Sequence, residues 1–137
     1  SLAGLRFGYA IAAPELIAGM MKVKDSYNAD AIAIAAATAA IKDQAYLKAN
    51  VAKVVAERER LTGELRKSGF IVPASNANFV LAQAAGKAAG DIFNELAARH
   101  IYVRYFKVAG LEDKLRITIG TREQNDKLLA ALKEILA

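Results

Sequence analysis

Three arginines in or beside apolar, strand-like segments are the residues best suited to binding chemistry. Arg6 stands in the segment AGLRFG, Arg104 ends IYVR, and Arg116 lies in LRITIGT. A guanidinium in an apolar strand is costly unless it is paired, and its planar fork fits carboxylate and phosphate groups through two parallel hydrogen bonds. We therefore consider an anion-binding role, above all for Arg116. The alternative is an internal salt bridge to Asp or Glu, or an outward-facing arginine on a half-exposed strand.

No other internal set of groups makes a complete active site. His100 stands at the end of a predicted helix, where a capping or surface role is favoured over metal binding. The sequence has no second histidine and no cysteine, so thiolate metal sites and disulfides are excluded. The serines lack a nucleophile-elbow context, and the segment around Gly86 lacks a phosphate-loop pattern. None of these residues makes a complete active site by itself.

Composition is that of an ordinary globular domain. The chain has 137 residues, of which 55% are hydrophobic and 24% charged, enough for a real core. The net charge of +5 permits an anionic partner, but no block of basic residues appears, so most of the excess is attributed to solvated helix faces. The longest apolar stretch, residues 31–41, is shorter than the roughly 20 residues of a membrane span. We expect a soluble protein, with a reducing cytoplasm permitted, and neither membrane nor nucleic acid as a partner.

The elements that must position the arginines follow from periodicity and end signals. The order of the predicted helices and strands along the chain predicts an α/β fold, with helices packed on one side of a small open sheet. A cap at Asn28 or Asp30, a second at Asp43, a stop at Gly69 and a capping box of Thr121 and Gln124 mark helix ends. The predicted helices are 14–23, 29–41, 43–67, 88–100 and one after 121; the predicted strands are 5–12, 70–72, 79–83, 101–106 and 114–119.

The predicted strand at residues 5–12 has no partner in the chain. A buried-type strand without neighbours leaves a row of backbone donors and acceptors unpaired. We interpret this segment as a sign that the chain is part of something larger. It is expected to pair with another copy of the chain or to be poorly ordered, and not to join the chain's own sheet.

The segment LAGLRFGYAIA, residues 2–12, resembles the stretch that follows the Schiff-base lysine in fold-type I, class I/II pyridoxal-phosphate-dependent aminotransferases of the histidinol-phosphate branch. Further similar segments follow in the same order over nearly the whole chain. They are Ser26-Tyr27-Asn28, Asn76-Ala77-Asn78-Phe79-Val80, residues 101–106, Gly110-Leu111, residues 115–121 and Glu123-Gln124-Asn125.

The resemblance implies roles for four residues. Arg6 matches the arginine that binds the 5′-phosphate of the cofactor, pyridoxal 5′-phosphate. Arg116 matches the arginine that holds the substrate's acidic group, which is the α-carboxylate of glutamate in one half-reaction and the phosphate of histidinol phosphate in the other. Arg104 matches a second arginine on the phosphate side, and Tyr27 a tyrosine close to the substrate pocket. The catalytic lysine would lie upstream of residue 1, so the chain alone is expected to be inactive.

The resemblance also implies the organisation. Residues 1–28 would be a remnant of the cofactor-binding large domain. Residues 29–137 would be the C-terminal small domain with long connecting helices, its sheet mostly antiparallel. The whole enzyme would be a cytoplasmic homodimer that exchanges an amino group between histidinol phosphate and 2-oxoglutarate in histidine biosynthesis. Two alternatives stay open: a relative acting on aromatic amino acids or a phosphothreonine-like substrate, and a basic α/β module that binds nucleic acid through Tyr102, Tyr105 and Phe106.

Overall fold

The computed structural model describes residues 2–84 and 86–137, and the chain divides into two compact units, Ser1–Ala49 and Asn50–Ala137. Helix α3 (Gln44–Lys67) begins in the first unit and ends in the second. The predicted boundary after residue 28 falls inside the first unit. The assignment of residues 1–28 to a separate large domain stays a prediction.

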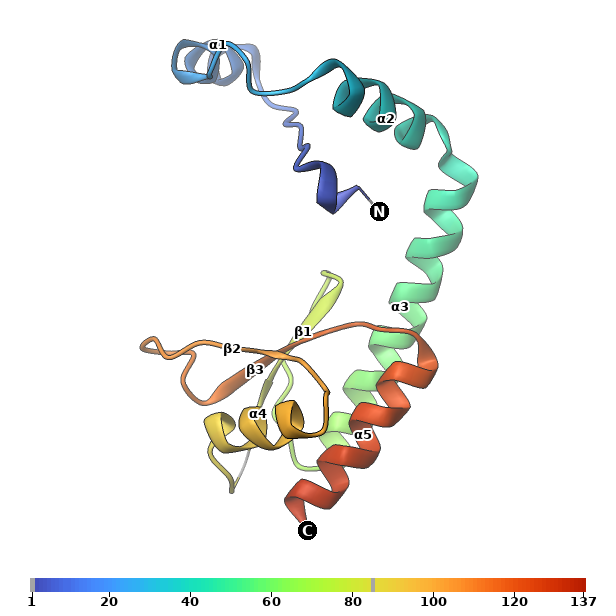
Figure 1. The fold of residues 1–137 in the computed structure, drawn as a ribbon, viewed down its shortest axis with the longest axis vertical. Helices are drawn as coiled ribbons and strands as arrows, with labels where there is room; N and C mark the ends of the chain where they lie inside the picture. The colour runs from blue at the N-terminus through green and yellow to red at the C-terminus, as the bar shows by residue number, and fades with distance from the viewer. Residues whose placement is uncertain (1, 85) are drawn as a thin grey trace. The chain divides into compact units, whose positions relative to one another are not determined.

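The second unit is built on a three-stranded antiparallel sheet (Figure 1). Strands β1 (Phe79–Gln83), β2 (Arg104–Tyr105) and β3 (Lys114–Thr118) lie in the order β1-β3-β2. Helix α4 (Ala89–Ala98), helix α5 (Arg122–Leu136) and the C-terminal half of α3 pack against it. This arrangement confirms the predicted α/β fold with helices on a small antiparallel sheet.

Alternation along β1 and β3 decides which face of the sheet is covered. Successive strand residues point to opposite faces. Val80 and Ala82 on β1, with Leu115 and Ile117 on β3, are buried. They join one core with residues of the three helices, namely Leu61, Leu65, Ala89, Ile92, Leu96, Leu128, Ala131, Leu132 and Ile135. The other face therefore carries the residues between them in sequence, and Arg116 is one of these.

Four predicted helix-end signals are confirmed, with Asp30 rather than Asn28 as the cap of α2, whereas the helix predicted over 88–100 ends earlier, at Ala98. The carboxylate of Asp30 accepts the backbone N–H of Ala33 at 2.8 Å, and Asp43 caps α3 in the same way. Gly69 takes a left-handed φ of +88°, which ends α3. Thr121 and Gln124 form both bonds of the predicted capping box at the start of α5.

Three predicted strands differ from the structure. Residues 5–12 are not a strand: a short 3₁₀ helix η1 (Ala3–Leu5) is followed by irregular chain, because no segment in the described part of the chain offers its donors and acceptors. Residues 70–72 contribute one bridge, Ile71 to Gln83. Of residues 101–106 only Arg104 and Tyr105 pair with β3. Residues 101–103, Ile117 and Thr118 are among those that line a groove of about 450 Å³.

The first unit consists of η1, α1 (Pro14–Val23), α2 (Ala31–Lys42) and the start of α3. Most of its side chains are exposed, including Ile32 and Tyr46. The N-terminal segment and α2 line a shallow groove of about 640 Å³. A surface this apolar is typical of one that other protein surface covers.

None of the helices in residues 2–84 and 86–137 is long and apolar enough to cross a membrane.

Candidate anion-binding site

Arg104 and Arg116 are cross-strand neighbours. Arg104 on β2 pairs directly with Arg116 on β3, and Arg116 pairs on its other side with Leu81 on β1. Directly opposite residues of an antiparallel pair project from the same face of the sheet. The two guanidinium groups therefore share the face opposite the helical core. We call these two residues the arginine pair.

Two phenylalanine rings hold the arginine pair. The guanidinium carbon Cζ of Arg104 lies 5.1 Å from the ring centroid of Phe106, and that of Arg116 lies 5.7 Å from the same centroid. Arg116 also lies over Phe79, at 5.2 Å from its centroid. Contacts of this length are within the range of cation–π attraction. Phe106 thus contacts both arginines, whereas Phe79 contacts Arg116 alone.

The arginine pair has no acidic partner in residues 2–84 and 86–137. None of the ion pairs there involves Arg104 or Arg116. The Nε–H of Arg116 is buried and has no hydrogen-bond partner, which costs about 1–3 kcal/mol. Like charges directly opposite each other on neighbouring strands are also destabilising. An anion with several acceptor oxygens would accept a hydrogen bond from this N–H and would reduce the repulsion between the two charges. The internal salt bridge considered as the alternative is not formed in the described residues.

Lys114, on the same strand as Arg116, has the charged partner that the arginine pair lacks in the described residues. Lys114 forms an ion pair with Asp113 and donates to the backbone oxygen of Gly110 at 2.9 Å. Its hydrogen bond lowers the pKa of the Asp113 carboxyl below the ordinary value. The charge of Lys114 is therefore balanced within the protein, while that of the arginine pair is not.

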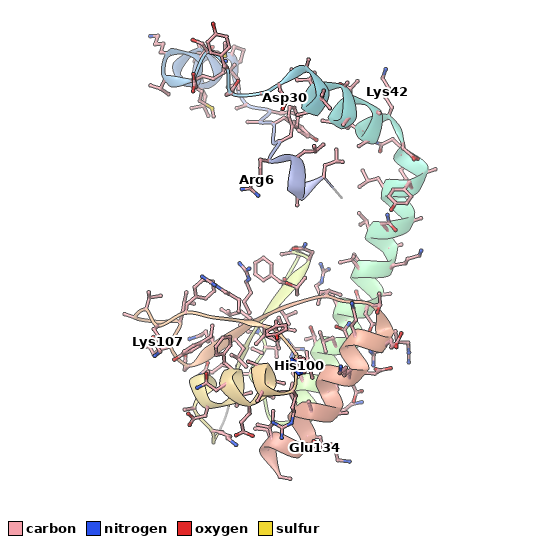
Figure 2. The ribbon with its side chains drawn as sticks, in the orientation of Figure 1. Arg6, Asp30, Lys42, His100, Lys107 and Glu134 are labelled. Atoms are coloured by element: carbon pink, nitrogen blue, oxygen red, sulfur yellow. The ribbon has the colours of Figure 1, made fainter. Side chains whose placement is uncertain are left out.

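Arg6 and Tyr27 belong to the first unit, and the arginine pair to the second. Arg6 closes η1 with a left-handed φ of 55°, and its Nη1 donates to the backbone oxygen of Ala3 at 3.3 Å. Figure 2 shows its side chain extending away from the rest of that unit. Tyr27 is 94% exposed, in a turn where its N–H donates to the Asp25 carboxylate.

Arg6 fits the phosphate group that the resemblance implies. Its Nη1 donates to the backbone oxygen of Ala3, but no carboxylate of residues 2–84 or 86–137 forms an ion pair with it, so the N–H groups of Nε and Nη2 remain available. A phosphate monoester accepts two parallel bonds from such a fork. Arg6 is thus suited to the 5′-phosphate of pyridoxal phosphate.

His100 ends α4. It has a left-handed φ of 57°, its side chain is exposed, and its backbone N–H donates to Ala97 at 3.0 Å. These observations agree with the predicted capping or surface role. The part of the chain that the structure describes contains no cluster of His, Asp or Glu able to hold a metal ion.

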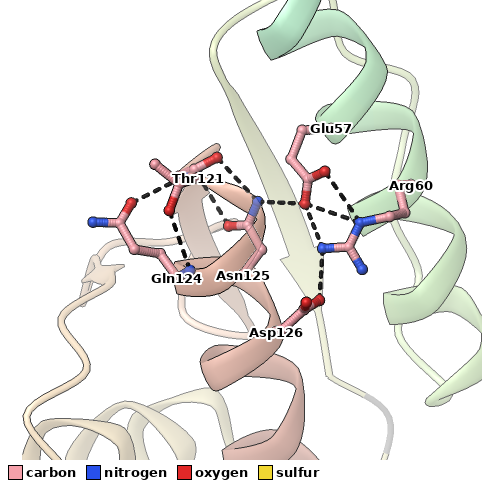
Figure 3. A network of polar contacts seen from close by, with 7 residues as sticks. Glu57, Arg60, Thr121, Gln124, Asn125 and Asp126 are labelled. Atoms are coloured by element: carbon pink, nitrogen blue, oxygen red, sulfur yellow. Dashed lines mark hydrogen bonds and ion pairs between the residues drawn. The ribbon is translucent and has the colours of Figure 1, made fainter.

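A polar network that the sequence reasoning missed fixes the turn after β3 (Figure 3). Asn125 on α5 is 2% exposed; its Nδ2 donates to Glu57 at 3.1 Å and to the Gly120 oxygen at 3.2 Å, and its Oδ1 accepts the Gly120 N–H. Arg60 on α3 joins Glu57 to Asp126 on α5. Because Gly120 follows β3, the network holds the end of the strand that carries Arg116. The signal was present: Asn125 precedes Leu128 and Leu132 at helical spacing, on the apolar face of α5.

The network also perturbs two titrating groups. The hydrogen bond from Arg60 holds the pKa of the Glu57 carboxyl below its ordinary value, and the bond from Asn125 adds to this effect against the opposing effect of burial. The hydrogen bond to Glu57 raises the pKa of Arg60 above its usual range, so the guanidinium stays charged. The network is thus ionised at neutral pH.

Comparison with known proteins shows the family of the chain. Residues 1–132 match the family model of aminotransferase class I and II. The chain is 55% identical to histidinol-phosphate aminotransferase 1 of Nostoc sp., over 99% of this chain and 38% of that protein.

Two solved structures share the fold. The histidinol-phosphate aminotransferase of Clostridium acetobutylicum superposes with a TM-score of 0.87 at 31% identity, over 99% of this chain and 42% of that one. The enzyme of Sinorhizobium meliloti, in complex with pyridoxal-5′-phosphate, gives 0.83 at 34% identity, over 98% of this chain and 38% of that one. The chain thus spans about two-fifths of the length of the relatives it matches. It belongs to the class I and II aminotransferases, has their fold-type I architecture, and corresponds to their C-terminal part.

Proposed function

We propose that the chain is the C-terminal part of a pyridoxal-phosphate-dependent aminotransferase that exchanges an amino group between L-histidinol phosphate and 2-oxoglutarate in histidine biosynthesis. The observation that carries this proposal is the arginine pair: two arginines directly opposite each other on neighbouring strands, on the sheet face opposite the helical core, without an acidic partner in residues 2–84 and 86–137. A pair of cations suits a substrate that carries a phosphate group. The names of the relatives, which are histidinol-phosphate aminotransferases, support the same substrate.

Each arginine has its own task in this proposal. Arg116 binds the acidic group of either substrate, the α-carboxylate of glutamate or the phosphate of histidinol phosphate, and so fixes the reacting amine relative to the cofactor. Arg104 adds a second cation when that group is a phosphate. Arg6 holds the 5′-phosphate of pyridoxal phosphate, and Tyr27 lies beside the substrate. Pyridoxal phosphate, when bound, supplies the electron sink for the transfer.

We further propose that the whole enzyme is a cytoplasmic homodimer and that residues 1–28 are part of its large domain. The exposed apolar side chains of the first unit, among them Ile32, Ile34 and Leu47, support the association with further protein, because so many exposed apolar side chains are typical of a surface that other protein covers. In the whole enzyme they would be covered by the large domain or by the second subunit.

The test is an activity assay of the full-length protein. With pyridoxal phosphate, histidinol phosphate and 2-oxoglutarate, we expect glutamate to form, and aromatic amino acids and phosphothreonine to be poorer amino donors. The isolated chain of 137 residues should be inactive, and borohydride with pyridoxal phosphate should label its lysines only at low, scattered stoichiometry. A preference for aromatic amino acids as donors would show that the proposed substrate, histidinol phosphate, is wrong. A single stoichiometric lysine adduct on the isolated chain would overturn the placement of the catalytic lysine upstream of residue 1.

A further inference from the structure

Phe106 is the one ring that contacts both members of the arginine pair in the part of the chain that the structure describes. Both guanidinium carbons lie within 5.7 Å of its centroid. The residue follows Arg104 by two positions, the spacing that places side chains on the same face of an extended chain. Its ring is half-buried, which keeps it in place beside the two cations.

An aromatic ring holds a guanidinium in a way that a carboxylate does not. The negative face of the ring attracts the cation through its flat surface. The in-plane N–H groups of the arginine therefore remain available to a ligand. A carboxylate at the same place would occupy those N–H groups and neutralise the charge. Phe106 thus reduces the cost of placing two like charges side by side without blocking the site.

The two rings act on the pair unequally. Phe79 contacts Arg116 alone, at 5.2 Å, whereas Phe106 contacts both arginines. One guanidinium suffices for a carboxylate, because two parallel hydrogen bonds satisfy both of its oxygens. A phosphate group has three acceptor oxygens and about two negative charges, so it profits from both guanidinium groups. Loss of Phe106 should therefore harm phosphate binding more than carboxylate binding.

We propose that Phe106 is a positioning residue that holds Arg104 and Arg116 at the spacing a phosphate group requires, and that it sets the preference of this site for phosphate over carboxylate. The identity of the substrates rests on the proposed function. The preference between the two anions does not, because it can be measured with simple ions on the chain itself.

The first experiment titrates the chain with inorganic phosphate and, separately, with acetate at constant ionic strength. The readout is the NMR signal of the Arg116 Nε–H, assigned through its loss in Arg116→Lys. Phe106→Leu and Phe106→Met keep the bulk and remove the aromatic face, Phe106→Tyr keeps the face, and Tyr102→Leu removes an exposed aromatic residue of the same segment as a control.

The expected result is a loss of phosphate affinity of about 5- to 30-fold in Phe106→Leu and Phe106→Met, from two cation–π contacts. Acetate affinity should change less, and Phe106→Tyr and Tyr102→Leu should behave like the unchanged chain. Equal losses for both anions, or no loss for phosphate, would overturn the proposal. Unfolding of both the Leu and Met variants would overturn it too, because the ring would then be a structural residue of the fold.

The second experiment uses the full-length enzyme and compares the two substrates. Phe106→Leu should raise KM for histidinol phosphate by about 5- to 30-fold and KM for glutamate less, with kcat nearly unchanged, whereas Phe79→Leu should raise both to a similar degree. If the unchanged enzyme does not use histidinol phosphate, the proposed function fails while the ion titration still decides the role of Phe106. If the enzyme is active and Phe106→Leu raises both KM values equally, the role of Phe106 fails and the proposed function stands.

Discussion

Arg104 and Arg116 lie directly opposite each other on antiparallel strands, and no carboxylate of residues 2–84 and 86–137 forms an ion pair with either. Proteins usually place opposite charges, or none, at such positions, because like charges there are destabilising. The fold therefore bears a cost at this face. In the proposed function an anionic ligand would remove this cost, and part of its binding energy would originate in this relief.

Replacing one charge of the arginine pair should stabilise the folded chain when no anion is bound. We expect Arg104→Gln to raise the free energy of unfolding at low ionic strength by about 0.2–1 kcal/mol, because the cross-strand repulsion is lost. The gain should shrink with added salt, which screens exposed charges. Urea denaturation at two salt concentrations measures it. Arg99→Gln, which removes an arginine paired with Glu95, is the control and should bring no gain. A loss of stability in Arg104→Gln at low salt would contradict the interpretation.

Asn125 should be a large contributor to the stability of the second unit. In Asn125→Ala the backbone N–H and oxygen of Gly120 lose their buried partner, and Glu57 loses a donor. We expect a loss of about 2–3 kcal/mol in the free energy of unfolding. Asn94→Ala on the exposed surface of α4 is the matched control and should change it by less than about 0.5 kcal/mol. Similar effects of the two substitutions in thermal or urea denaturation would show that the network is not structural.

The lowered pKa of Glu57 predicts how the free energy of unfolding depends on pH. Its pKa in the folded chain is lowered from the ordinary value of 4.5, mainly by the hydrogen bond from Arg60. A lowered pKa means that the charged carboxylate stabilises the fold above pH 4.5 and that this contribution is lost as the pH falls through the folded pKa. Unfolding free energies of the unchanged chain and Glu57→Gln should therefore differ at pH 7 and converge at low pH. A difference that is independent of pH would exclude the ionised network.

Two glycines should respond oppositely to the same substitution. A Cβ at Gly120 would lie 2.7 Å from Oε1 and 3.1 Å from Cβ of Gln124, so Gly120→Ala must displace the side chain that completes the capping box. The expected loss is about 0.5–2 kcal/mol, the value of an N-cap. A Cβ built on Gly63, within α3, would have no atom within 4 Å among those compared. Gly63→Ala should therefore raise the free energy of unfolding by up to about 1 kcal/mol. Thermal denaturation of both variants decides it, and stabilisation by Gly120→Ala would be the contradicting result.

The sequence predicts the elements whose signals are local. Strands β1 and β3 follow from alternation, and the end of α3 at Gly69 and the start of α5 at Thr121 from residue types that suit helix ends. The predicted strand at 5–12 fails for the opposite reason. Its composition suits a strand, but pairing depends on a neighbour that the described part of the chain does not supply.

The sequence singles out the arginines of the candidate site one by one, but it does not specify their arrangement. Arg104 and Arg116 were singled out because a strand arginine needs a partner. That the two face each other depends on the register of β2 against β3, and the contact with Phe79 depends on β1. Register is a property of the folded sheet that a single segment does not specify. Asn125 was missed because its partner Glu57 lies 68 residues away in the sequence.

The most direct test of the arginine pair is kcat/KM of the full-length enzyme for both substrates in Arg116→Lys and Arg104→Ala. Lysine keeps the charge of Arg116 but loses the two-bond geometry, so we expect kcat/KM to fall about 10- to 100-fold for glutamate and for histidinol phosphate alike. Arg104→Ala should lower kcat/KM for histidinol phosphate much more than kcat/KM for glutamate. Pyridoxal phosphate should still be bound in both variants. Unchanged kinetics with both substrates, together with loss of stability, would show that the arginines are structural and would contradict an anion site.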